Sequence, residues 1–136
     1  MNYVTYFLSL LLLVITTNCA DLQMEHVTVT AYSSTIEETD STPFIAAWGD
    51  SVGAGTIAIS RDLLTELSRG QRVLLFLNGH SSAPDTFVVN DKMNRRWKKR
   101  VDIWFENKQA AYRFGKKKEV LLLWSNTSIP EKIIIK

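Results

Sequence analysis

Two aspartates, Asp91 and Asp102, have the residue type and the sequence context that best fit acid–base chemistry in this chain. Asp91 follows the apolar run "FVVN", and Asp102 lies between Val101 and Ile103. A carboxyl group at the edge of an apolar strand is partly buried, and such a group can act as a general acid near neutral pH. Structural roles are the alternatives: Asp91 could accept backbone hydrogen bonds in a turn, and Asp102 could pair with Arg100 or Lys99.

A basic segment, residues 92 to 100, connects the two aspartates. It contains Lys92, Arg95, Arg96, Lys98, Lys99 and Arg100 around a single tryptophan, Trp97. Positive charge attracts an anionic polymer, and an indole ring offers a stacking face. A solvated loop is the alternative. Of the other tryptophans, Trp104 and Trp124 lie inside strand patterns, where core packing is expected.

Metal and cofactor chemistry has little support in the sequence. The two histidines, His26 and His80, are far apart in the chain, and neither a cysteine nor a third histidine accompanies them, so a zinc site is weakly supported. Phosphate-binding, dinucleotide-binding and serine-hydrolase motifs are absent. We expect no metal and no organic cofactor.

The first twenty residues carry no charge, and their apolar centre, residues 7 to 15, is too short to span a bilayer. This pattern indicates a signal peptide over residues 1–20. In a bacterium, Cys19 could instead carry a lipid anchor, which would be the protein's only contact with a membrane. We therefore expect an exported protein in the periplasm, in the cell envelope or secreted. Since Cys19 is the one cysteine, the mature domain has no internal disulfide.

The remaining residues, 21–136, suit one small domain that buries a single core, because 46% of the 136 residues are hydrophobic. Apolar runs and alternating patterns predict short strands, and leucine and alanine spacing predicts two short helices. The expected strands are 26–34, 44–49, 53–60, 71–80, 85–91, 100–105 and 117–125, the helices are 61–70 and 106–115, residues 34–43 form a loop, and 129–136 form an edge strand or tail. Many short strands with little helix favour a small β-barrel.

The order of five motifs carries a resemblance to a known family. The segments "VTVTAYSS", "TPFIAAWG", "GAGTIAIS", "VVNDKMNRRWKKRVDIWF" and "AAYRFGKKKEVLLLW" resemble the 3D domain, which is named for three aspartates and occurs in bacterial cell-wall proteins related to MltA-type lytic transglycosylases and resuscitation-promoting-factor-like enzymes. The resemblance covers about residues 26–125. It implies a mainly β fold, a six-stranded double-psi β-barrel with one or two short helices.

The resemblance also implies roles for particular residues. By the resemblance, Asp102 corresponds to the catalytic acid of the family, and Asp91 would support that acid or position the sugar. Two departures are visible: Ser60 stands where the first aspartate is expected, with Asp62 two residues later, and the bulky basic "KMNRRWKK" replaces a glycine-rich stretch. Asp91 and Asp102 are expected on adjacent elements of the barrel.

The function implied is cleavage of peptidoglycan at the β-1,4 bond between N-acetylmuramic acid and N-acetylglucosamine. A lytic transglycosylase needs one carboxylate, Asp102, whereas a hydrolase would also use Asp91. Tyr32, Lys92, Arg95 and Trp97 are the expected substrate contacts. The alternative is a non-catalytic module that binds peptidoglycan. Nucleic acid is an improbable partner for an exported chain, and we expect a monomer.

Overall fold

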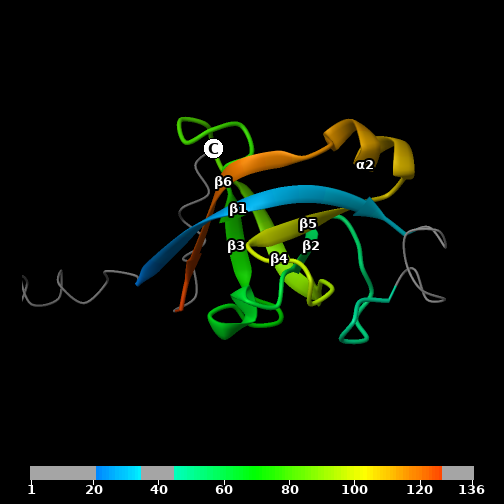
Figure 1. The fold of residues 1–136 in the computed structure, drawn as a ribbon, viewed down its shortest axis with the longest axis horizontal. Coiled ribbons are helices and arrows are strands. Elements are labelled where there is room, and N and C mark those ends of the chain that lie inside the picture. The colour runs from blue at the N-terminus through cyan, green and yellow to red at the C-terminus, as the bar shows by residue number, and fades with distance from the viewer. Residues whose placement is uncertain (1–20, 35–44, 127–136) are drawn as a thin grey trace, which may run out of the picture.

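The computed structural model describes residues 21–34 and 45–126, and six strands in this part of the chain close into a barrel (Figure 1). The order around the barrel is β1-β5-β2-β4-β3-β6. The elements are β1 (Leu22–Ser33), β2 (Thr56–Ile59), the 3-10 turn η1 (Leu63–Thr65), β3 (Arg72–Leu75), β4 (Asp85–Lys92), β5 (Arg100–Phe105), α2 (Lys108–Phe114) and β6 (Lys117–Ser125). The predicted fold class, a mainly β, closed six-stranded barrel with little helix, is confirmed.

The barrel mixes parallel and antiparallel pairs. β1 is parallel to β5, and β2 is parallel to β4, whereas the other four pairs around the barrel are antiparallel. A parallel pair needs a crossover connection rather than a hairpin. The basic segment connects β4 to β5, which lie on the two sides of β2 in the barrel.

Strand alternation separates the core from the outer face. In β1, Val27 and Val29 are buried, while Thr30 and Tyr32 are half-buried on the opposite face. The same period of two runs through the other strands because neighbouring side chains of a strand point to opposite faces. The core consists of Val27, Val29, Ile57, Ile59, Leu63, Leu67, Val73, Leu75, Val89, Val101, Ile103, Val120, Leu122 and Trp124.

The helix α2 confirms the prediction made for residues 106–115. The side chain of Asn107 accepts a hydrogen bond from the backbone N–H of Ala110 at 2.8 Å, which caps the first turn. Gly115, with φ of 68°, ends the helix in the left-handed region that glycine tolerates. The ring of Phe114 packs 5.4 Å from that of Phe105, which ties the helix to β5.

Three sequence predictions for local structure were wrong. Residues 45–49 form a tight turn rather than a core strand, because Gly49 donates back to Ala46 and Ile45 pairs with Ser51. The predicted helix 61–70 is only the turn η1, and the predicted strand 71–80 ends at Leu75. Leu67 is buried and Leu77 is partly buried against the core, although both lie outside regular elements.

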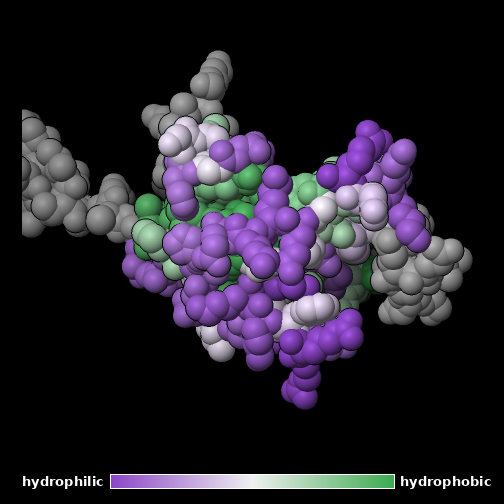
Figure 2. All heavy atoms as spheres, turned by 45° about the horizontal axis from the view of Figure 1, so that its top comes forward, coloured by the Kyte–Doolittle hydropathy of each residue, from purple (hydrophilic) through white to green (hydrophobic). Residues whose placement is uncertain are grey.

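The predicted signal peptide and the tail at 129–136 lie outside the described residues, as does the predicted loop apart from Ser34. Within the described ranges, no helix has the length and apolar character needed to cross a bilayer. Figure 2 shows a mainly hydrophilic face with a hydrophobic area over the N-terminal end of β1, where Leu22 and Met24 are exposed.

Candidate functional site

Asp91 and Asp102 lie on either side of Ala58 in β2. Ala58 pairs with Asp91 of β4 across one edge and with Asp102 of β5 across the other. The two aspartates are therefore two strand spacings apart, about 9–10 Å between their backbones. The expectation that they occupy adjacent barrel elements was wrong, since β2 lies between β4 and β5.

A β-bulge at Asn90 sets the position of Asp91. The register of β2 and β4 shifts between Ile57 and Ala58, so that Asn90 is the extra residue. The side chain of Asn90 donates to the carbonyl of Ser51 at 2.9 Å, and Asp91 Oδ1 accepts from the backbone N–H of Ala47 at 2.7 Å. The bulge therefore turns both side chains toward the turn at 45–51.

The carboxylate of Asp91 has a structural role in this arrangement. Its Oδ1 also accepts from the backbone N–H of Lys92 at 2.8 Å, so one oxygen receives two amide hydrogen bonds. Hydrogen bonds from amides to a carboxylate are stronger than those between neutral groups. Asp91 thus fastens the turn at 45–51 to the end of β4.

Asp102 is half-buried on the outer face of β5, where it pairs with Thr30 of β1. The hydroxyl of Thr30 donates to Asp102 Oδ1 at 2.9 Å. Because Thr30 is held by the parallel β1–β5 ladder, this bond fixes the carboxylate against a rigid strand. The Asp102 carboxyl is thereby held in a defined orientation.

Tyr32 lies on the same face of β1 as Thr30, two residues further along. Its hydroxyl is buried and, within the described residues, has no hydrogen-bond partner. Burial raises the pKa of Tyr32 above its usual value, and the negative charges of Asp91 and Asp102 raise it further. The hydroxyl therefore keeps its proton. Both carboxylates lie near enough to Tyr32 to raise its pKa, which places the three side chains in one region.

The tryptophan beside this site, Trp104, does not belong to the core. It pairs with Tyr32 across β1 and β5, is half-buried, and donates from Nε1 to the hydroxyl of Ser34 at 2.7 Å. Core packing was therefore a wrong expectation for Trp104. For Trp124 it is confirmed, since only 3% of that residue is exposed.

The basic segment places its cations on aromatic rings. The guanidinium of Arg100 lies 3.8 Å from the centre of the Trp97 ring, and that of Arg96 lies 4.8 Å from it. The ammonium of Lys92 lies 5.7 Å from the Trp48 ring. Such contacts hold cations in place at a surface. Trp97 is consequently the base of a cationic stack, and Arg95 is exposed beside it.

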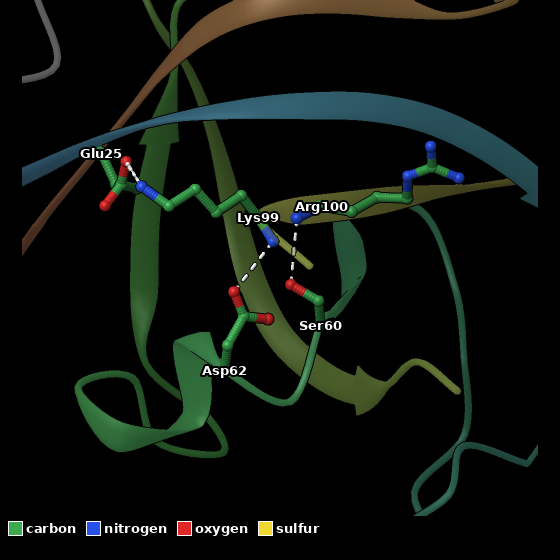
Figure 3. Close-up of polar contacts among 5 residues, drawn as sticks. All are labelled: Glu25, Ser60, Asp62, Lys99 and Arg100. Carbon is green, nitrogen blue, oxygen red and sulfur yellow. Dashed lines mark hydrogen bonds and ion pairs between the residues drawn. The ribbon is translucent and has the colours of Figure 1, made fainter. Parts of the chain in front are cut away.

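Ser60 and Asp62, at the departure from the family pattern, support the start of β5 (Figure 3). Ser60 is fully buried; its hydroxyl accepts from the N–H of Arg100 at 3.0 Å, and its own N–H donates to the Arg100 carbonyl at 2.9 Å. Asp62 Oδ2 accepts from the N–H of Lys99 at 2.9 Å. Lys99 has a φ of 44°, which costs energy for a side chain with a Cβ, so this bond holds a strained residue.

The protonation of Asp62 reflects the same contacts. Desolvation raises the pKa of Asp62, but the hydrogen bond from the Lys99 N–H, the neighbouring polar groups of Ser60 and of the Asp62 backbone, and the charge of Lys98 outweigh it and lower the pKa below 3.8. The ammonium of Lys99 lies 2.9 Å from Glu25 Oε1, close by on β1. Asp62 is thus an ionised structural group, rather than a replacement for a proton donor.

Sequence reasoning missed a pocket on this side of the molecule. It has a volume of about 310 Å³ and is lined by Gln23, Met24, Glu25, Asp62, Leu63, Thr65, Glu66, Lys99 and Trp124. Neither Asp91 nor Asp102 lines it. Of its polar groups, Asp62 Oδ2 accepts from the Lys99 N–H and Glu25 pairs with the Lys99 ammonium, while Asp62 Oδ1 has no hydrogen-bond partner within the described residues.

Comparisons with known proteins bear on the fold of the chain. No family model matches the chain, and no curated protein matches it in sequence. Among solved structures, the chain is similar to a Streptomyces papain inhibitor, with 17% sequence identity and a TM-score of 0.50 over 75% of this chain and 94% of the inhibitor. At that identity the likeness supports the barrel fold alone.

Proposed function

We propose that this protein cleaves the glycan strands of peptidoglycan at the β-1,4 bond between N-acetylmuramic acid and N-acetylglucosamine, with Asp102 as the proton donor. The observation that carries the proposal is the outer-face carboxylate of Asp102, fixed by Thr30 and adjacent to the buried donor Tyr32. The resemblance to the 3D domain supports it on the same residue. On this account residues 1–20 direct export, and the protein acts outside the cytoplasmic membrane.

Asp91 accepts hydrogen bonds from two backbone amides, whereas Asp102 accepts one from the Thr30 hydroxyl, and this difference favours a reaction that uses Asp102 alone. Retaining glycosidases place their two carboxyl groups about 5–5.5 Å apart, and inverting ones about 6.5–9.5 Å apart. Asp91 and Asp102 start from backbones two strands apart, and Asp91 Oδ1 already accepts two amide hydrogen bonds. A retaining mechanism with Asp91 as the nucleophile therefore fits poorly.

A transglycosylase step uses Asp102 twice. The protonated carboxyl of Asp102 gives its proton to the leaving glycosidic oxygen as the bond from that oxygen to C1 of the muramic residue breaks. The carboxylate then takes the proton of the muramic C6 hydroxyl while that oxygen attacks C1. The product is a 1,6-anhydro sugar, no water is consumed, and Asp102 ends protonated as it began.

The residues around Asp102 would bind and orient the sugar. Tyr32 would act on the nearby Asp102 carboxyl rather than on the sugar, because its hydroxyl is buried and its raised pKa keeps the proton in place. The cationic stack on Trp97, with Lys92 and Arg95, would meet the lactyl and peptide carboxylates of the wall. These contacts make the glycan strand the partner that the surface fits best.

A non-catalytic peptidoglycan-binding module is the second candidate, and a specific observation favours it. Ser60 and Asp91, at two of the family's three aspartate positions, both have hydrogen bonds that serve the backbone. A barrel with these contacts could hold a glycan strand without cutting it. This candidate predicts that the protein sediments with sacculi and releases nothing from them.

Digestion of purified sacculi separates the two candidates. The wild-type protein is expected to lower the turbidity of a sacculus suspension, and Asp102→Asn is expected to bind the sacculi without lowering it. Asp85→Asn, which changes an exposed carboxylate at the start of β4, is the matched control and should digest as wild type does. Equal digestion by Asp102→Asn would exclude the proposed proton donor.

A further inference from the structure

The two histidines of the chain, distant in sequence, meet on the outer surface of the barrel. The ring centres of His26 and His80 are 5.9 Å apart, and the rings are nearly perpendicular at 78°. Both residues are exposed. The sequence argument against a metal site rested partly on their separation along the chain, which the fold removes, and partly on the lack of a third ligand, which still holds within the described residues.

The barrel itself explains why they meet. His26 of β1 pairs with Leu121 of β6, and the N–H of Phe76, just after β3, donates to the Leu121 carbonyl at 3.1 Å. A tight turn follows, in which Gly79 has a φ of 92°. The turn brings His80 back over this row, where its ring lies 6.4 Å from that of Phe76. Strand pairing therefore fixes one histidine, and the turn fixes the other.

We propose that His26 and His80 together bind one late transition-metal dication, Cu²⁺ in preference to Ni²⁺ or Zn²⁺, through one ring nitrogen each. Two metal–nitrogen bonds of about 2.0–2.1 Å, added to the radii of the two rings, span about 6 Å. The observed separation of 5.9 Å between the ring centres is close to this span. The rings meet at 78°, so the two exposed imidazoles must turn about their side-chain torsions for one nitrogen of each to face the same metal.

The preference for copper follows from the number of ligands. Within the described residues, no cluster of three or more histidine, cysteine, aspartate or glutamate side chains could hold a metal. The pair thus supplies two imidazoles, and water completes the coordination. Zn²⁺ sites in proteins usually take three or four protein ligands, whereas Cu²⁺ binds a given set of nitrogen ligands most tightly among the first-row dications.

The metal site is separate from the candidate catalytic site. His26 precedes Thr30, the partner of Asp102, by four residues along β1, which is about 13 Å in an extended strand. The proposal therefore does not rest on peptidoglycan cleavage, and it is tested without sacculi.

Copper titration of the full chain tests the proposal. The protein is purified without a histidine tag and carries Cys19→Ser, so that the two imidazoles are its only histidine or cysteine ligands. We expect calorimetry to show one Cu²⁺ per chain and electron paramagnetic resonance to show two coordinated nitrogens. His26→Asn and His80→Asn should each weaken binding about tenfold or more, because the second ligand acts at high effective concentration. Glu106→Gln, an exposed carboxylate beyond β5, should bind as the parent does.

Three results would overturn the proposal: no binding of one equivalent, wild-type affinity in either single variant, or a spectrum with one coordinated nitrogen. If a histidine variant fails to fold, nuclear magnetic resonance of the protein with both histidines intact still tests the proposal. Sub-stoichiometric Cu²⁺ should broaden the nuclear magnetic resonance signals of both imidazole rings equally, before those of residues around Asp102. Broadening of one ring alone would also contradict a shared metal.

Discussion

Asp91 and Asp102 are paired to the same residue, Ala58, from its two sides. The parallel β2–β4 pair and the antiparallel β2–β5 pair thereby bring two carboxylates to one row on the outer face of the barrel. Their contacts divide the roles: Asp91 accepts from backbone amides, whereas Asp102 accepts from the Thr30 hydroxyl. The first serves the turn at 45–51, and the second is the group that we propose to act on a substrate.

A pair of substitutions at Asp91 tests its structural role. Asp91→Asn keeps an oxygen that can accept from Ala47 and Lys92, so it should unfold at nearly the wild-type urea concentration and retain most of the sacculus digestion. Asp91→Ala leaves both N–H groups without that acceptor and should lower the free energy of unfolding by about 1–3 kcal/mol. Loss of digestion in a stable Asp91→Asn protein would instead make Asp91 part of the chemistry.

Tyr32→Phe removes a buried hydroxyl that has no hydrogen-bond partner in the described residues. The free energy of unfolding should stay the same or rise by about 1 kcal/mol, because an unpaired polar group no longer has to be desolvated. Sacculus digestion should fall, because the Asp102 carboxyl loses a neighbouring polar group that shares its electrostatic environment. A variant with reduced stability and full activity would contradict both expectations.

The raised pKa of Tyr32 gives an alkaline signature. In the unfolded chain tyrosine ionises near its ordinary pKa of 10.0, while the folded protein holds the proton to higher pH. The stability contributed by the neutral hydroxyl is therefore complete below pH 10.0 and is lost as pH rises above it. Absorbance titration of the wild type should show one late-ionising tyrosine that is missing from Tyr32→Phe; identical curves would contradict the burial.

Ser60→Ala should show that Ser60 supports the fold. The substitution leaves the Arg100 N–H without its acceptor in a fully buried place, and the free energy of unfolding should fall by about 1–3 kcal/mol. Digestion per folded molecule should be unchanged. Ser82→Ala, which removes a hydroxyl bonded to the Gly79 carbonyl in a surface loop, is the control and should cost less than about 0.5 kcal/mol.

The lowered pKa of Asp62 predicts how the free energy of unfolding changes at acidic pH. Although desolvation opposes it, hydrogen bonding lowers the pKa of Asp62 below 3.8, so its ionised form adds stability that is present above that pH and lost as pH falls through the lowered value. In urea unfolding from neutral pH downward, Asp62→Asn should lose less stability than wild type below pH 3.8. Asp85→Asn is the exposed control, and parallel curves for wild type and Asp62→Asn would contradict the assignment.

Much of the fold could be predicted from the sequence because strand alternation is a local property. The strands at 85–91 and 100–105 and the helix before Gly115 follow from such patterns. The apolar run at 44–49 misled, since Gly49 closes it into a turn and Trp48 packs on the core from outside the barrel. Apolar content alone does not distinguish a strand from a turn that covers a core.

The arrangement of the site depends on register, which a local pattern does not contain. Asp91 and Asp102 are close in sequence, yet β2 is inserted between their strands by a parallel pairing. The bulge at Asn90 changes which residue faces Ala58, and nothing in "VVND" specifies it. The meeting of His26 and His80 likewise depends on β6 lying beside both β1 and β3.

The most direct test of the central claim is mass spectrometry of the soluble products released from peptidoglycan sacculi by the wild-type protein and by Asp102→Asn. The account predicts 1,6-anhydro-muropeptides from the wild type and none from a folded Asp102→Asn protein. Reducing-end products would point to a hydrolase that uses water. Anhydro products from Asp102→Asn, or no products from a wild-type protein that binds the sacculi, would contradict Asp102 as the proton donor.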